Sequence, residues 1–185
     1  MNSLSYILRL VGWVLLQGIL LNNINLFGYA NPALYLLFFM TYPAVENKIL
    51  LLFLATLSGL VIDIFSQTSG VYSCATLSVV FLRPLLIRLF FGQNFEGQEI
   101  ALLQVSATLR ILYIFSFALV FHLIFSLLEA FQWKLWLYSI DRTMVNVLFT
   151  AIVCLFVAQL VGNRKENKYW GLIIWFKSIA YLKQK

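Results

Sequence analysis

Polar side chains within the longest apolar runs are the residues of this sequence that could do chemistry. His122, Ser126 and Glu129 follow one another at spacings of four and three residues, so on a helix they share one stripe. A proton or ion path through a membrane requires such a stripe. The alternative is a histidine bonded to a neighbouring helix, with Glu129 at the surface. Asn146 and Thr150 are also four apart and can hydrogen-bond to another helix.

The sequence contains no recognised catalytic signature. It has one histidine, and it lacks HExxH zinc spacing, a GxSxG elbow and a glycine loop that would cradle a phosphate. Cys74 and Cys154 lie inside apolar runs, where small buried side chains are expected rather than a disulfide or a metal pair. We therefore expect neither an enzyme nor a bound metal or cofactor.

The elements that hold these residues belong to a membrane protein. Hydrophobic residues make up 62% of the 185 residues and charged residues 11%, whereas a soluble domain has about 25% charged residues. No hydrophilic stretch is long enough for a soluble domain. The basic residues are spread around the apolar runs, which argues against a nucleic-acid partner. The composition predicts an all-α polytopic membrane protein.

The apolar runs predict about six transmembrane helices in one bundle over residues 1–163. A basic, aromatic tail at 164–185 is expected in the cytoplasm or on the membrane surface. The second run is short and either crosses with help from residues 26–29 or is partly re-entrant, and Pro32 suits the first position of its helix. The expected runs are 4–21, 33–45, 49–65, one beginning at Val71, 109–128 and 143–161.

Two charged residues lie where charge is costly. Asp63 is near the end of the third run, and Arg83 is 12 residues beyond Val71, or about 18 Å along a helix. A charge at mid-bilayer costs roughly 2.5–3.5 kcal/mol, so each requires a polar partner, a water-filled pocket or a route to the headgroups. We expect the two to lie at different depths and not to pair. Pro84 should kink or end the fourth helix near Arg83.

A face of small residues accompanies Asp63. Ala55 and Gly59 are four apart and share a helical face with it, which lets another helix approach closely. Gly70 ends the polar turn that begins at Ser66. This face and the Arg83–Pro84 kink form either the internal packing of the bundle or the groove for a partner helix.

Basic residues orient the chain. With six spans and the amino terminus inside, eleven lysines and arginines lie on or toward the cytoplasm, whereas only Lys134 and Arg142 lie on the far side. This bias predicts a multi-pass protein with both termini cytoplasmic. It places Asp63 near the outer face and Arg83 toward the inner one.

Several motifs, taken in order, carry a resemblance. They are Asn25-Leu-Phe-Gly-Tyr-Ala-Asn-Pro-Ala-Leu-Tyr-Leu-Leu-Phe38, Gly59-Leu-Val-Ile-Asp-Ile-Phe65, Gly70 and Phe81-Leu-Arg-Pro84. Their order and spacing resemble the rod shape-determining protein MreD family, in the version found in Bacteroidota. The similarity runs from about residue 8 to 163 and leaves out the tail after about Lys165.

The resemblance implies a non-enzymatic component of the bacterial inner membrane, belonging to the machinery of cell elongation and peptidoglycan synthesis. The family's partners are the bitopic protein MreC and, with it, MreB, RodA and the elongation transpeptidase. The resemblance also implies a fold similar to the substrate-binding subunits of vitamin transporters. The alternative is therefore a small-solute-binding or transport subunit, with Asp63, His122 and Asn146 in a polar pocket.

Overall fold

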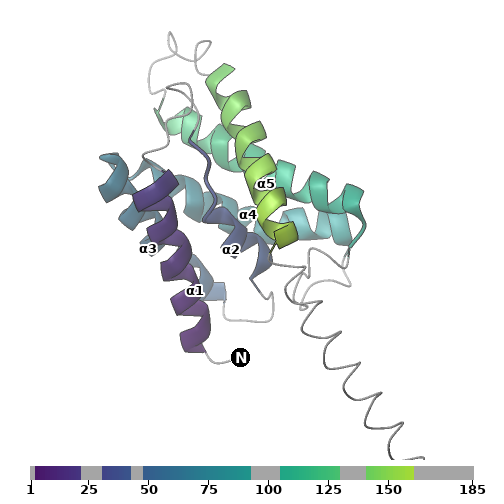
Figure 1. The fold of residues 1–185 in the computed structure, drawn as a ribbon, viewed down its shortest axis with the longest axis horizontal. Coiled ribbons are helices and arrows are strands. Elements are labelled where there is room, and N and C mark those ends of the chain that lie inside the picture. Colours follow the sequence, from purple (N-terminus) through teal and green to yellow (C-terminus); the bar gives the residue numbers. More distant parts are fainter. Residues whose placement is uncertain (1–2, 22–30, 43–47, 93–104, 130–140, 161–185) are drawn as a thin grey trace, which may run out of the picture.

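The computed structural model describes residues 3–21, 31–42, 48–92, 105–129 and 141–160, and every structural statement below concerns these ranges (Figure 1). Secondary structure in them is helical, with no strand. The expected tail and the residues around Lys134 lie outside the described ranges. The elements are α1 (Ser3–Leu15), a π-helical turn (Leu16–Leu20), α2 (Leu36–Thr41), α3 (Lys48–Ser66), α4 (Val71–Phe91), α5 (Ala107–Glu129) and a last helix, Asp141–Leu160.

Four helices are long and apolar enough to cross a membrane, as expected of a multi-pass membrane protein. They are α3, α4, α5 and the last helix, with mean hydropathies of 1.8 to 2.4. Between 33% and 39% of each most apolar window is buried, so most of each helix surface faces outward, as a lipid-facing helix requires. α1 contributes a shorter apolar helix, Ile7–Ile19.

The second predicted run is not one continuous helix over its described residues, 33–42. Only Leu36–Thr41 is α-helical there, and the residues before it are non-helical or in a turn. Pro32 does not begin the helix either, because α2 starts four residues later at Leu36. The described residues thus contain four helices long enough to cross a membrane and a shorter α1, and they do not confirm six spans. They also contain a partly non-helical segment, 31–42, which we call the central segment.

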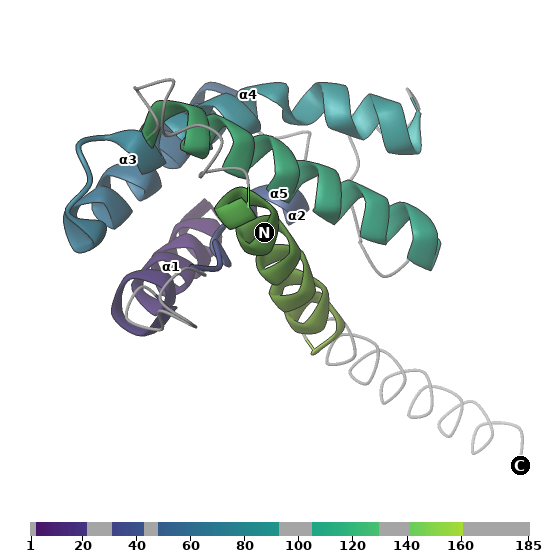
Figure 2. The same cartoon turned by 90° about the horizontal axis from the view of Figure 1, so that it is seen from above.

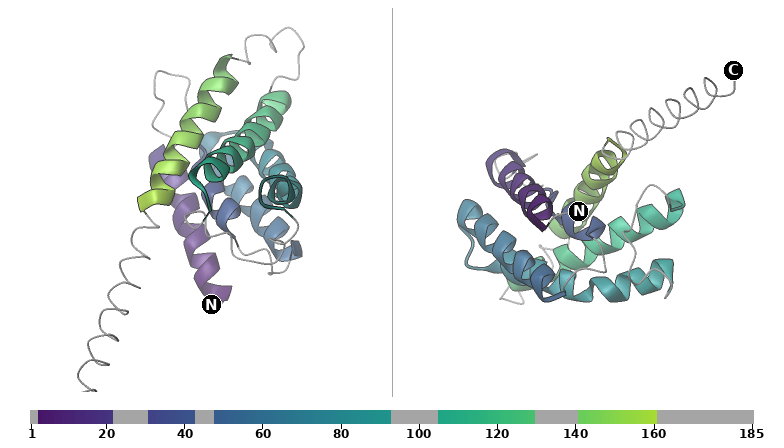
Figure 3. Two further views of the ribbon diagram at one scale, coloured as in Figure 1. Left: turned by 90° about the vertical axis from the view of Figure 1, so that its right-hand side faces the viewer. Right: turned by 90° about the horizontal axis from the view of Figure 1, so that it is seen from below.

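The helices form two layers around the central segment. α3, α4 and α5 lie side by side in one layer, with neighbours antiparallel: Phe91 of α4 meets Tyr113 of α5, and Tyr72 meets Phe125 (Figure 2). α1 and the last helix diverge on the other side, and α2 lies between the layers (Figure 3). The central segment is thus surrounded by helices.

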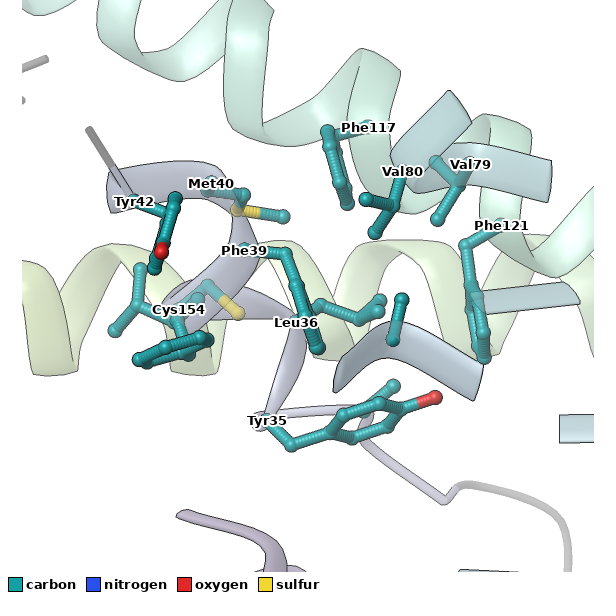
Figure 4. Close-up of a cluster of buried hydrophobic side chains, with 14 of the residues drawn as sticks. Tyr35, Leu36, Phe39, Met40, Tyr42, Val79, Val80, Phe117, Phe121 and Cys154 are labelled. Atoms are coloured by element: carbon teal, nitrogen blue, oxygen red, sulfur yellow. The ribbon is translucent and has the colours of Figure 1, made fainter. Parts of the chain in front are cut away.

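The core is built on the central segment. Tyr35, Leu36, Phe39 and Met40 are fully buried, and no residue from Ala33 to Met40 is more than 5% exposed. Figure 4 shows these side chains meeting Val79 and Val80 of α4, Phe117 and Phe121 of α5, and Cys154 of the last helix. Helices in a bilayer associate through van der Waals contacts and hydrogen bonds rather than through exclusion of water, so this closely packed segment is a main contributor to the packing of the bundle.

The central segment runs from one end of the bundle toward the other. The Asn31 side chain meets the Tyr72 hydroxyl at the start of α4, and the Tyr42 carbonyl meets Arg83 further along α4. Eleven residues of α4 separate these contacts, or about 17 Å of helix. The segment therefore returns the chain from the end where Gly18 approaches Phe65 of α3 toward the end where α3 begins.

Candidate functional site

Asp63 holds together the turn between α3 and α4. Its Oδ1 accepts hydrogen bonds from the Tyr72 amide (3.0 Å) and the Thr68 hydroxyl (2.5 Å). Its Oδ2 accepts from the Ser73 amide (3.0 Å) and the Ser73 hydroxyl (2.5 Å). The two amides belong to the first turn of α4, where an anion complements the helix dipole and satisfies N–H groups that have no partner in the helix. The buried carboxylate is a helix cap supplied by the preceding helix.

Gly59 sets the distance between α3 and α4. A Cβ atom there would lie against the Ser73 backbone, 2.8 Å from its nitrogen and closer still to its Cα, so any side chain would force the helices apart. Ala55, one turn earlier, is fully buried. The structure thus places Ala55, Gly59 and Asp63 in contacts within the chain, which was one of the two readings left open by the sequence. It does not place them on a free groove.

Gly70 serves the same turn through its backbone. It precedes α4 with φ of 88°, a left-handed conformation that residues with a Cβ rarely adopt. Nothing lies within 4 Å of the position its Cβ would take, so the requirement for glycine is conformational. Gln67 in the same turn also has positive φ, at 55°.

Arg83 caps the opposite end of the central segment. It is 3% exposed, and its guanidinium donates to the Tyr42 carbonyl just after α2 ends. The Tyr113 hydroxyl of α5 lies beside it and donates to the Met40 carbonyl (3.3 Å). A cation at a helix carboxyl end complements the dipole, as Asp63 does at an amino end. Asp63 and Arg83 therefore have separate partners, as expected.

Pro84 does not end α4. The helix continues through it to Phe91, so of the two expected outcomes, a kink or a helix end near Arg83, the structure excludes the end. Proline removes one N–H from a helix, which leaves the Val80 carbonyl without its usual intrahelical partner. Pro84 lies on the exposed side of α4 while Arg83 points inward.

The backbone at the start of the central segment bonds side chains of two other elements, the π-helical turn and the last helix. Gln17 donates to the Pro32 carbonyl (2.6 Å) and accepts from the Leu34 amide (2.8 Å). On the other side, the Asn31 amide donates to Asn146 (2.9 Å) and the Ala33 amide to Thr150 (3.2 Å). Non-helical backbone at membrane depth persists only where protein groups replace water. These polar residues supply that replacement.

Gln17 lies in the π-helical turn that follows α1. This turn runs from Leu16 to Leu20, and the Gln17 side chain is 1% exposed. Gly18 follows, where a Cβ would meet the Phe65 ring at 2.6 Å. A π-turn changes the direction of the side chains that follow it. Here it accompanies both the inward amide of Gln17 and the close contact with α3.

His122 and Glu129, which the sequence places on one stripe, have different roles. His122 Nε2 lies 2.8 Å from the Thr150 hydroxyl, the group that accepts from Ala33. Glu129 forms an ion pair with Arg142 at 3.6 Å, and both side chains are about half exposed. The histidine bonded to a neighbouring helix, with Glu129 at the surface, is the reading that the geometry matches.

A small polar pocket lies between the end of α5 and the start of the last helix. Its volume is about 10 Å³, close to the space of one water molecule. We call it the Glu129 pocket. Its polar lining is His122, Ser126, Glu129, Arg142, Thr143 and Asn146.

Sequence reasoning missed three of the residues that matter most here: Gln17, Thr76 and Tyr113. Gln17 was a single polar residue inside an apolar run, and that was its only signal. Thr76 shares a 2.5 Å hydrogen bond with the Tyr35 hydroxyl. Asp63 does not contribute to the Glu129 pocket, contrary to the polar pocket imagined for a solute-binding subunit, whereas His122 and Asn146 do.

Comparison of the chain with models of known protein families, with curated proteins and with solved structures finds no match in any of the three.

Proposed function

We propose that this chain is a non-enzymatic scaffold of the inner-membrane cell-elongation machinery, of the MreD type, that receives the transmembrane segment of an MreC-type partner. What supports the proposal is that the motifs carrying the resemblance coincide with the residues that build the interior. Asp63 and Gly70 form the α3–α4 turn, Arg83 holds the end of the central segment, and Pro32 accepts from Gln17.

The side chains that could take part in chemistry instead form hydrogen bonds within the bundle. Asp63 accepts four hydrogen bonds, and His122 is bonded to Thr150. Four long helices present large apolar side chains outward, among them Phe53, Phe81 and Ile152, each more than 60% exposed. Such a body offers membrane helices a surface to pack against rather than a reaction centre.

Six passes with both termini cytoplasmic belong to the same proposal. Its support is the run of the central segment, which returns the chain between α1 and α3 and so acts as the second pass. The proposal also includes a fold similar to the substrate-binding subunits of vitamin transporters, which the resemblance implies. For the alternative, a solute-binding subunit, the Glu129 pocket as it stands has room for about one water molecule and not for a metabolite.

Photocrosslinking from single exposed positions tests the scaffold. A photoreactive phenylalanine analogue is placed in turn at Leu8, Phe53, Phe81, Leu123 and Ile152, one position on each long element. We expect adducts with an MreC-type single-span protein concentrated on one or two neighbouring elements. Phe117, which is fully buried, is the matched control and should give no protein adduct.

Lipid adducts alone at all five positions would contradict the scaffold. A stoichiometric small molecule retained by the purified chain would instead favour the solute-binding alternative. Native mass spectrometry of the chain released from detergent measures this directly.

A further inference from the structure

The Glu129 pocket connects the surface with the anchor of the central segment. The Glu129–Arg142 ion pair lies at its exposed rim, and these two are its charged lining residues. His122, only 5% exposed, lies seven residues before Glu129, or about 10 Å deeper along α5. The pocket therefore leads from a half-exposed ion pair to a buried imidazole.

The chemistry of the lining suits a water molecule. A buried water makes about two to four hydrogen bonds, and a polar cavity of roughly 10–15 Å³ holds one. The pocket measures about 10 Å³ and offers the Ser126 hydroxyl and the Asn146 amide beside the imidazole. Phe125 closes one side as an apolar wall and packs on Tyr72, with ring centroids 4.7 Å apart.

His122 has one nitrogen available to such a water. Its Nε2 is engaged with Thr150, so Nδ1 is the nitrogen left for the pocket. A neutral imidazole has one donor and one acceptor nitrogen, and water can serve as either partner. Either arrangement of the His122–Thr150 bond is therefore compatible with a water at Nδ1.

We propose that the Glu129 pocket holds one ordered water that hydrogen-bonds His122 and exchanges with the solution at the Glu129 end of the bundle. Solution thereby reaches a hydrogen-bonded chain that runs from the water through His122 and Thr150 to the Ala33 amide. The exchange replaces one water molecule by another, so it breaks no covalent bond and changes no net charge. This site is independent of the scaffold function and of the partner.

The single histidine makes the test specific, because isotope labelling of histidine gives signals from one ring. In lipid nanodiscs, NMR polarisation transfer from water to the His122 ring is compared with transfer to the backbone amides of Phe117 and Ala118, buried on the same helix. We expect transfer to the ring to be at least several-fold faster. Equal, slow transfer to all three would overturn the proposal.

Filling the pocket sharpens the test. Ser126→Leu should reduce transfer to the ring several-fold, whereas Ser116→Leu, the same change on α5 outside the pocket lining, should leave it unchanged. Unchanged transfer in folded Ser126→Leu protein would show that water arrives elsewhere and would overturn the site. If Ser126→Leu does not fold, Ser126→Ala removes the same hydroxyl with little change of shape and should lower the transfer too. No change in that variant would count against the proposal.

Discussion

Asp63 and Arg83 each complement a buried helix end, but their hydrogen-bond partners lie at very different distances along the sequence. Each is a charge buried at the end of a helix: an anion at the start of α4 and a cation after the end of α2. The Asp63 partners are at most 10 residues away, whereas Arg83 reaches a carbonyl 41 residues away. The first closes a local hairpin, and the second fastens the central segment to a distant helix.

This difference separates two kinds of stability. The α3–α4 hairpin combines a close helix approach at Gly59 with a complete set of bonds at Asp63, so it is fixed by neighbours in sequence. In the central segment, local backbone hydrogen bonds begin only with the Leu36 amide. The amides before it and the carbonyls of Pro32 and Tyr42 depend on Gln17, Asn146, Thr150 and Arg83. Disrupting the hairpin should therefore loosen the whole bundle, and disrupting an anchor should loosen mainly the segment.

The largest effect is expected at Asp63. Asp63→Ala leaves the Tyr72 and Ser73 amides without acceptors in a buried turn, and we expect a loss of about 4 kcal/mol, since each bond to a charged group contributes roughly 1.5–3 kcal/mol. Thermal unfolding of the purified protein in detergent measures it. Asp63→Asn, the control, keeps the shape but replaces one acceptor oxygen by a donor, and it should fall between wild type and Asp63→Ala. Equal stability of all three proteins would refute the cap.

A smaller effect is expected at Arg83. Arg83→Met keeps most of the side-chain volume but leaves the Tyr42 carbonyl without its donor, which costs about 1–3 kcal/mol. Arg9→Met, at an exposed position on α1, should change stability by less than about 0.5 kcal/mol. The same unfolding measurement distinguishes them. A larger loss from Arg9→Met than from Arg83→Met would reverse the assignment.

The smallest change in stability is expected for alanine at two glycines, Gly70 and Gly12, where a Cβ would meet no other atom within 4 Å. Gly70→Ala forces a side chain into the left-handed conformation and should cost about 1 kcal/mol. Gly12→Ala, inside α1, should instead be neutral or stabilising by up to about 1 kcal/mol, since alanine favours the helix. Melting temperatures that move in the same direction for both would show that φ at Gly70 is not the cause.

The long helices could be predicted from sequence because apolar length alone specifies them. The predicted runs at 49–65 and 109–128 differ from α3 and α5 by no more than two residues at either end. The cost of charge at Asp63 and Arg83 was likewise visible, and it predicted a polar partner, a water-filled pocket or a route to the headgroups for each. The structure shows polar partners for both.

The partners themselves could not be predicted, except where they are local. An apolar run such as 33–45 has the same composition whether it forms a spanning helix or a partly extended buried segment. The choice depends on Gln17, Asn146 and Thr150, which lie far away in sequence. Only tertiary structure brings these groups to the backbone that they satisfy.

Hydrogen exchange at the central segment tests most directly whether the buried polar residues serve this backbone. NMR in nanodiscs should show slow exchange of the Ala33 and Leu34 amides in the wild type. Gln17→Leu should accelerate exchange of Leu34 by at least about tenfold, the equivalent of ~1.4 kcal/mol, with a smaller effect on Ala33. Thr150→Val should accelerate exchange of the Ala33 amide, with a smaller effect on Leu34. Fast exchange of both amides in the wild type, or equal acceleration of both by either variant, would contradict the account.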